Sequence, residues 1–298
     1  MKRFLPLLAA LCLIFTGCAA PAASQPEDGT LRIVATTYPV YLFTTAVTEG
    51  VEGVEVTRLI TESISCLHDY TLTVNDMKAI EQADILIMNG AGLEDFMSDA
   101  LAQTSAAVID CSGGVDLLAA QGHEGHDHET EYDPHIWMTK DGAAAMMSAI
   151  LDGLTQLDES NAQRYADNFT AACSLLSDIP DETAPLAHPY FITFHDGFQY
   201  FSGAFGLTLL KSIEEEEGSE ASAAEVKEIV ALIREYDIPA IFTEKNGSDA
   251  TARAIARETG VSVYQLDMIM SGEGSGVGPY IDAMNANLDV IAQALGGN

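Results

Sequence analysis

The sequence predicts an α/β protein of two lobes, each built on a parallel sheet, that are joined by a long connecting helix. Short apolar runs alternate along the chain with segments of helical periodicity, which is the pattern of repeated strand and helix units. One run, Ile85–Met88, is apolar at every position, as expected for a strand covered on both faces. The pattern starts again in the second half of the 298 residues, a length that suits two domains.

The first residues have the features of a secretion signal. Two basic residues precede an apolar run over 4–15, which is shorter than the ~20 residues that a spanning helix needs. The following Phe15-Thr16-Gly17-Cys18 resembles a bacterial lipobox, with an ordinary signal peptide and a chance cysteine as the alternative. We therefore expect a signal peptide over 1–17, a lipidated Cys18 that holds the protein at the outer side of the cytoplasmic membrane, and a tether over 18–29.

The folded part is strongly acidic. Without residues 1–17 the chain keeps 11 of its 13 basic residues against 45 acidic ones, a formal net charge of −34. Such a charge excludes nucleic acid as a partner and raises the local concentration of cations, although solubility alone would also explain it. Hydrophobic residues make up 48% of the sequence, which is ample for packed cores.

An N-terminal lobe is expected over residues 30–138. Its strands are predicted at Ile33–Ala35, Val54–Ile60, Ile85–Met88 and Ala107–Ile109. Thr73-Val74-Asn75-Asp76 has the form of a capping box, which marks the start of a helix. The apolar residues at helical spacing that follow are Val74, Met77 and Ile80.

A helical segment is expected over residues 139–179, between the lobes. From Asp158 until shortly before Pro180, apolar side chains recur on one helical face: Tyr165, Phe169, Ala172 and Leu176. We interpret this stretch as one connecting helix, and about twenty residues would span roughly 30 Å. A strut of that length would limit the movement of the lobes, so we predict little closure between them.

A C-terminal lobe is expected over residues 180–298. Its strands are predicted at Tyr190–Phe194, Leu207–Leu210, Ala240–Thr243 and Val261–Leu266. A second capping sequence, Ser222-Ala223-Ala224-Glu225, begins a helix, and Gly260 ends another helix that starts near Ser248.

Histidines are concentrated in segments that also contain carboxylates. Six of the seven fall in Cys66–Tyr70, His123–Glu129, Asp133–Trp137 and Phe194–Phe198, and the seventh is His188. Neutral imidazole is the commonest protein ligand for zinc and similar metals, so this clustering indicates metal binding. The histidine-rich loop over 122–131 could gather metal weakly, or it is simply an acidic, solvated loop.

The predicted metal ligands are His68, His135, His195 and Asp267. His68, His195 and Asp267 each follow a predicted strand, at the end of a sheet where α/β proteins bind ligands. Three imidazoles and one carboxylate would complete a tetrahedral zinc shell and leave no place for an attacking water. Three aspartates flank the histidines and could orient an imidazole through its second nitrogen, namely Asp69, Asp133 and Asp196.

Four motifs resemble those of the bacterial ABC-transporter solute-binding lipoproteins for zinc and manganese, the cluster A-I metal-binding proteins. They are His68-Asp69-Tyr70, Asp133-Pro134-His135-Ile136-Trp137, Phe194-His195-Asp196-Gly197-Phe198-Gln199-Tyr200-Phe201 and Leu266-Asp267. The resemblance covers nearly the whole chain. It implies two α/β lobes joined by a long helix, metal in the cleft between them, and delivery to a membrane permease. In manganese members a carboxylate matches His195, so histidine there implies the zinc type.

The chain departs from the family pattern near two of the motifs. Leu67 stands where the family often has Pro or an acid, Cys66 is unusual, and Met268 replaces the common Pro after Leu-Asp. Asp267 remains the first choice for the fourth ligand, and the alternatives are the thiolate of Cys66, Glu244, water and the histidine-rich loop. Any disulfide stays open, since only Cys66, Cys111 and Cys173 remain beyond the signal and the anchor.

The sequence therefore predicts a monomeric, extracytoplasmic protein that captures Zn²⁺ with high affinity and passes it to an ABC permease. A manganese-binding member of the same family is one alternative. A zinc-dependent hydrolase is another, but it would need an open coordination position and the chain has no His-Glu-x-x-His sequence. We accordingly expect no enzyme activity.

Overall fold

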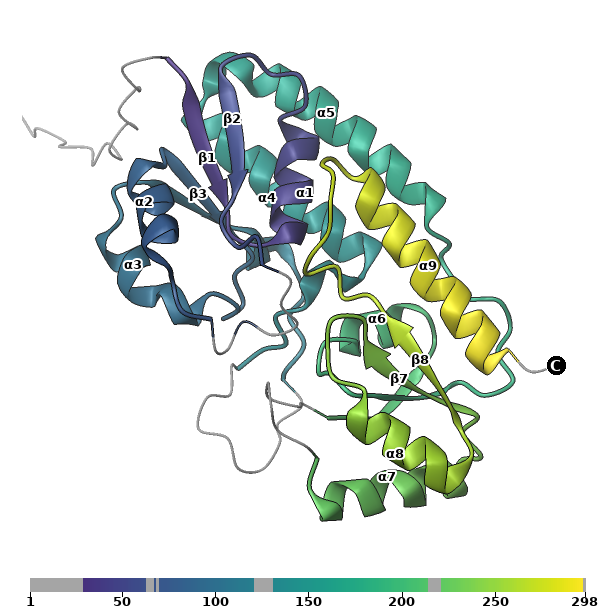
Figure 1. Cartoon of the computed structure of the whole chain (residues 1–298). Coiled ribbons are helices and arrows are strands. Elements are labelled where there is room, and N and C mark those ends of the chain that lie inside the picture. Colours follow the sequence, from purple (N-terminus) through teal and green to yellow (C-terminus); the bar gives the residue numbers. More distant parts are fainter. Residues whose placement is uncertain (1–28, 63–66, 68–69, 121–130, 214–220, 297–298) are drawn as a thin grey trace, which may run out of the picture.

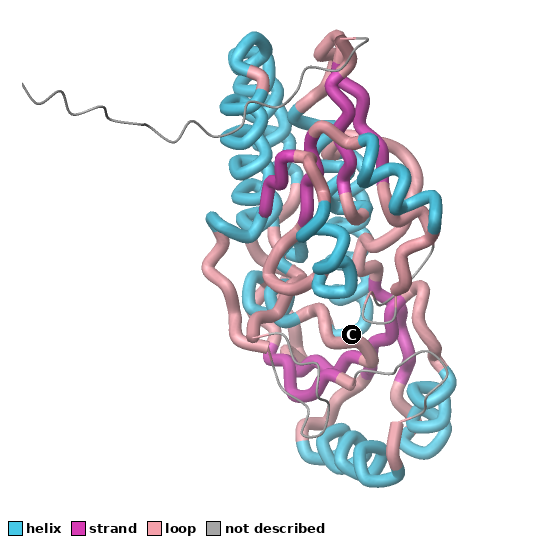
Figure 2. The backbone as a smooth tube through the Cα atoms, turned by 90° about the vertical axis from the view of Figure 1, so that its left-hand side faces the viewer, coloured by secondary structure: helices cyan, strands magenta, loops and turns pink. Residues whose placement is uncertain are grey.

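The computed structural model describes residues 29–62, 67, 70–120, 131–213 and 221–296. Within these ranges the chain forms two α/β lobes, each with its own four-stranded parallel sheet, as the sequence predicts. Figures 1 and 2 show the lobes one above the other in two perpendicular views. No helix in the described part of the chain is long and apolar enough to cross a membrane.

The N-terminal lobe contains the strands β1 (Leu31–Ala35), β2 (Val54–Arg58), β3 (Ile85–Met88) and β4 (Ala107–Asp110), in the order β2-β1-β3-β4. The helices α1 (Tyr38–Val47), α2 (Val74–Gln82) and α3 (Ser98–Gln103) connect them. The first three residues of β3 are completely buried, which agrees with its continuous apolar sequence.

The C-terminal lobe repeats this plan. Its strands are β5 (Tyr190–Thr193), β6 (Thr208–Ser212), β7 (Ala240–Glu244) and β8 (Ser262–Leu266), in the order β6-β5-β7-β8. Its helices are α6 (Gln199–Ala204), α7 (Ala223–Glu235) and α8 (Ala250–Thr259). All five residues of β7 are buried, so this central strand holds its C-terminal residue, Glu244, inside the protein.

The capping residues identified in the sequence lie at helix ends in the structure. Thr73 and Asp76 form a reciprocal capping box at α2, and Ser222 and Glu225 form another at α7. Gly260 ends α8 with φ +84°, a conformation that favours glycine.

The apolar face predicted for α2 is only partly buried. Ile80 is buried, but Val74 and Met77 are 72% and 45% exposed. The helix contacts β1. The buried Ile80 lies in the last turn of the helix and the two exposed residues lie in its first turns, so helical spacing alone overestimates the buried face.

Two packed helices occupy the segment between the lobes. They are α4 (Lys140–Leu157) and α5 (Ala162–Leu175), and α5 is flanked by the short 3-10 turns Glu159–Asn161 and Leu176–Asp178. The α-helical part of the predicted connecting helix is therefore 14 residues, or roughly 21 Å, rather than about twenty residues. Both α4 and α1 pack against α5, so α5 lies along the N-terminal lobe (Figure 1).

The C-terminal helix α9 (Gly278–Leu295) contacts both lobes along its length (Figure 1). Near its start, the buried ring of Tyr280 packs edge-on against Phe43 of α1, with 5.1 Å between ring centroids. At its end, the carbonyl of Leu295 accepts hydrogen bonds from the N–H groups of Ala187 and His188 at 3.0 and 3.1 Å, just before β5. Helix α9 therefore connects the lobes as a strut of 18 residues, a role that the sequence suggested for the segment after Asp158.

Candidate metal centre

His135 lies in the chain segment that passes between the lobes. It directly precedes a 3-10 turn over Ile136–Met138 and is 9% exposed. One carboxylate oxygen of Asp133 accepts hydrogen bonds from the backbone N–H of His135 at 2.9 Å and from its Nδ1 at 2.7 Å. This contact places the ring proton on Nδ1, so Nε2 is the nitrogen through which this imidazole would bind a metal.

His195 follows β5 and lies beside His135. The two ring centroids are 5.9 Å apart, with an interplanar angle of 87°, and His195 is 8% exposed. The hydroxyl of Thr193 donates a 2.6 Å hydrogen bond to the His195 carbonyl and fixes the backbone at the strand end. The structure thus brings together two of the predicted ligands, one from each side of the interlobe region.

Glu244, at the end of β7, faces His195. One carboxylate oxygen is 3.9 Å from the Nδ1 of His195, and the side chain is almost completely buried. Burial, reinforced by the negative charge of Asp267 and opposed by His135 and by a hydrogen bond from the backbone of Asn246, raises the pKa of Glu244 to about 8. A carboxyl group buried in this way is costly to ionise, and a cation beside it would offset that cost.

Asp267 directly follows β8 and is already held by polar contacts. One of its oxygens accepts a 2.7 Å hydrogen bond from the N–H of Ile269, and the other pairs with the ammonium group of Lys245 at 3.2 Å. Asn287 of α9 holds the Asp267 backbone through hydrogen bonds of 2.7 and 2.8 Å. Because the Lys245 side chain is 64% exposed, its ion pair is weak and a metal ion could displace it.

A glycine makes close packing around His135 possible. A Cβ atom on Gly197 would come within 2.3 Å of the Met268 methyl group and 3.0 Å of the His135 ring. A side chain at position 197 would therefore have to displace the end of Met268 and press against the His135 ring, so glycine suits this position.

His68, Asp69, Cys66 and residues 122–130 of the histidine-rich loop lie outside the described residues. Their neighbour Leu67 is described, and it is buried in the main hydrophobic core at 2% exposure. Within the described ranges no group of three or more His, Cys, Asp or Glu side chains is placed to hold one ion. Cys111 and Cys173, which are described, are both free thiols.

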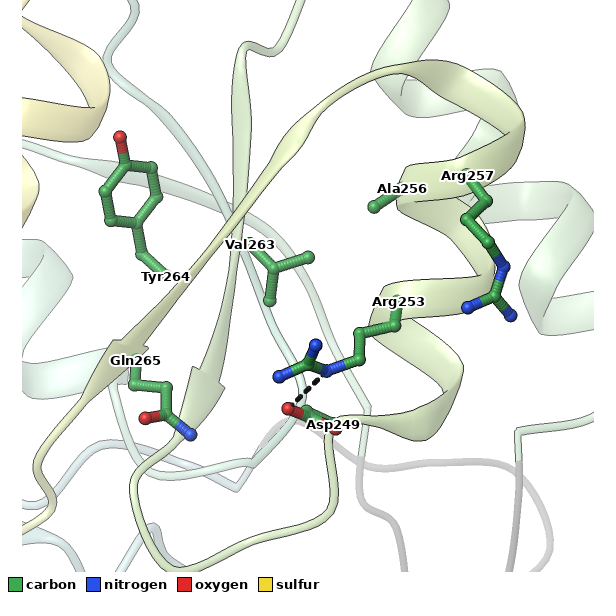
Figure 3. A pocket seen from close by; sticks show the side chains of 7 residues that line it. All are labelled: Asp249, Arg253, Ala256, Arg257, Val263, Tyr264 and Gln265. Carbon is green, nitrogen blue, oxygen red and sulfur yellow. Dashed lines mark hydrogen bonds and ion pairs between the residues drawn. The ribbon is translucent and has the colours of Figure 1, made fainter.

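A surface pocket of about 550 Å³ lies elsewhere in the C-terminal lobe, between α8 and β8 (Figure 3). Two guanidinium groups line it, and that of Arg253 pairs with Asp249 at 2.6 Å. The positive charge of Arg253 and Arg257 makes this pocket unsuitable for a metal cation.

Comparisons with known proteins agree with a metal-binding role. The zinc-binding lipoprotein AdcA of Streptococcus pneumoniae is 28% identical over 98% of the chain, and the match covers 61% of AdcA, so the chain spans less than two thirds of that relative. The manganese-binding lipoprotein MntA of Halalkalibacterium halodurans is 25% identical, over 96% of the chain and 95% of MntA.

A solved structure shows the same fold. It is the SBP FpvC of Pseudomonas aeruginosa in complex with Mn²⁺, with 27% identity, a TM-score of 0.76, and coverage of 90% of this chain and 98% of that one. A second structure of FpvC contains Ni²⁺, with a TM-score of 0.75.

A family model described as "Zinc-uptake complex component A periplasmic" matches residues 33–294. This match covers both lobes and the segment between them, and the relatives named above are metal-binding proteins rather than enzymes. The chain therefore belongs to the ZnuA family of metal-binding, solute-binding proteins.

Proposed function

We propose that this protein captures Zn²⁺ outside the cytoplasmic membrane and delivers it to an ABC permease for import. The observation that supports this best is the pair of imidazoles, His135 and His195, that face each other between the lobes while almost fully buried. Two imidazoles that are buried beside carboxylates suit zinc better than manganese, because manganese prefers oxygen ligands. The relatives carry names of both kinds, one zinc-binding and one manganese-binding.

The proposed ligands are His68, His135, His195 and Asp267. His68 lies outside the described residues, but its neighbour Leu67 is buried in the main hydrophobic core. A lipid on Cys18 would hold the protein at the membrane, where a monomer could meet the permease. The names of AdcA and MntA as lipoproteins support this part of the proposal.

A zinc titration of the metal-free protein against a competing chelator tests the proposal. We expect one tight equivalent in the wild type and its loss in His135→Ala and in His195→Ala. His188→Ala is the matched control, because His188 lies outside the four motifs and should leave binding unchanged. Tight zinc binding in both ligand variants would rule the proposal out. Competition with Mn²⁺ in the same assay measures whether the site prefers zinc or manganese.

The fourth ligand is tested by comparing two carboxamide substitutions. If Asp267 binds the metal directly, Asp267→Asn weakens zinc binding by more than the 10- to 100-fold typical of residues that only support a ligand, whereas Glu244→Gln stays within about that range. Asp249→Asn, at the residue that precedes α8, removes a carboxylate outside the site and serves as the control. The reverse ranking would assign the fourth position to Glu244.

A further inference from the structure

One buried side chain of the N-terminal lobe, that of Asn89, hydrogen-bonds to the backbone next to His135. Asn89 directly follows β3 and is completely buried. Its side-chain amide donates hydrogen bonds to the carbonyl of Pro134 at 2.9 Å and to that of Gly90 at 3.0 Å. The residue that precedes His135 is therefore attached to the end of a central strand of the N-terminal sheet.

Asn89 is in turn held by Glu94. The Glu94 carboxylate accepts hydrogen bonds from the backbone N–H groups of Asn89 at 2.8 Å and of Gly90 at 3.0 Å. The hydroxyl of Thr36, just after β1, donates a third at 2.7 Å. Glu94 is 1% exposed and all three donors are neutral, so these hydrogen bonds are what fix this carboxyl group in the core.

The turn that this carboxylate holds has an unusual backbone. Gly90, Ala91 and Gly92 all have positive φ angles, of 81°, 54° and 88°. Such angles are unfavourable for alanine, so the turn depends on contacts such as those with Glu94 for its shape. The direction in which Asn89 points is a consequence of that shape.

The C-terminal lobe also contacts the segment before His135. The hydroxyl of Tyr200, in α6, donates a 3.2 Å hydrogen bond to the Asp133 carbonyl. The Asp133 carboxylate then orients the His135 ring. Two consecutive carbonyls before His135, those of Asp133 and Pro134, are thus fixed by different lobes.

We propose that Asn89, fixed by Glu94, is a positioning residue for His135 and sets the affinity of the metal site by holding this imidazole in place before the ion arrives. The inference rests on the proposed function, since it concerns the same site. It assigns to Asn89 the role of a supporting partner that acts through the backbone rather than through the metal. Loss of such partners typically weakens metal binding by about 10- to 100-fold.

The test uses Asn89→Ala and the nearly isosteric Asn89→Asp in the full protein, titrated with Zn²⁺ against a chelator. We expect a 10- to 100-fold weaker affinity with one site retained, and a larger loss for Asp, because its carboxylate would face two carbonyls. The absorption spectrum of the Co²⁺-loaded variants should also change, since it reports ligand geometry. Ile85→Val, a buried position on β3, the strand that Asn89 follows, is the control: it should lower stability but change neither affinity nor spectrum.

A double substitution tests whether Glu94 acts through Asn89. If it does, Glu94→Gln weakens binding in the wild-type background but adds little to Asn89→Ala. Unchanged affinity and an unchanged Co²⁺ spectrum in both Asn89 variants would overturn the inference while wild-type binding, and with it the proposed function, stands. Absence of tight zinc binding in the wild type would overturn both.

Discussion

The indole N–H of Trp137 donates a 2.8 Å hydrogen bond to the backbone carbonyl of Met268. Trp137 belongs to the segment that carries His135, and Met268 directly follows Asp267 in the other lobe. The Trp137 carbonyl also accepts a 2.9 Å hydrogen bond from Tyr280 of α9. The buried Trp137 therefore connects the segment of His135 with that of Asp267, and it connects both with α9.

Trp137 should report metal binding through its fluorescence. It is the only tryptophan in the sequence, it is fully buried, and its ring centroid lies 5.3 Å from that of His135. We expect zinc to change the intensity of the tryptophan emission with a stoichiometry of one, because a cation on His135 alters the field around the indole. His135→Ala should remove the change, and a zinc response that persists in that variant would place the ion elsewhere.

Gly197→Ala should weaken zinc binding without unfolding the protein. The new methyl group would displace Met268 or the His135 ring, since their atoms would lie 2.3 and 3.0 Å from it. We expect at least a tenfold loss of zinc affinity, as for a misplaced supporting residue. Gly203→Ala, in α6 with no atom within 4 Å of the new Cβ, is the matched control and should raise helix stability by about 0.5–1 kcal/mol with unchanged affinity.

The sequence predicts the two sheets and much of the site because their signals are local. Ile85–Met88 is a strand by its own composition, and the capping boxes at Thr73 and Ser222 depend on residues three positions apart. His135 and His195 are predicted as ligands from motifs in which histidine, aspartate and glycine are close in sequence, and the structure places their rings side by side. Asp133 could be suggested as a supporting residue for the same reason, and the structure shows that contact.

Contacts between distant segments were not predictable in this way. Asn89 reaches Pro134 across 45 residues, and its sequence neighbourhood contains no sign of a metal site. The role of α9 as a strut depends on Tyr280 and Leu295 touching different lobes, which helical periodicity does not encode. Val74 and Met77 show that a local pattern can also mislead. Their helical spacing predicted that both are buried, but both are exposed in the structure.

The stability of the metal-free protein should fall between about pH 4.5 and pH 7 because of Glu94. Burial raises the pKa of this carboxyl group from 4.5 to about 7, despite the hydrogen bonds that favour its charged form. In this range the folded state binds more protons than the unfolded state, so stability is greatest below the lower value and is lost as the pH rises through the higher one. The loss from this group is of the order of 3 kcal/mol.

Urea unfolding of the wild type and of Glu94→Gln at pH 5 and pH 8 measures this effect. Other groups titrate as well, so the informative quantity is the difference between the two proteins. The variant lacks the titrating group and should lose less stability between the two pH values than the wild type does. Equal losses would show that Glu94 is not the source of the pH dependence.

Zinc should cause little closure of the lobes, because α9 is attached to both of them. Its first turns pack on α1 through Tyr280 and Phe43, and its last carbonyl binds the segment before β5. We expect small-angle X-ray scattering to give radii of gyration that agree within error for the metal-free and zinc-loaded protein. Ala286→Pro should break the exposed middle of the strut at a cost of about 3 kcal/mol and permit compaction with zinc, whereas Ala286→Gly should not. A clear zinc-dependent compaction of the wild type would contradict the strut, because a continuous helix fixed at both ends does not permit the lobes to swing.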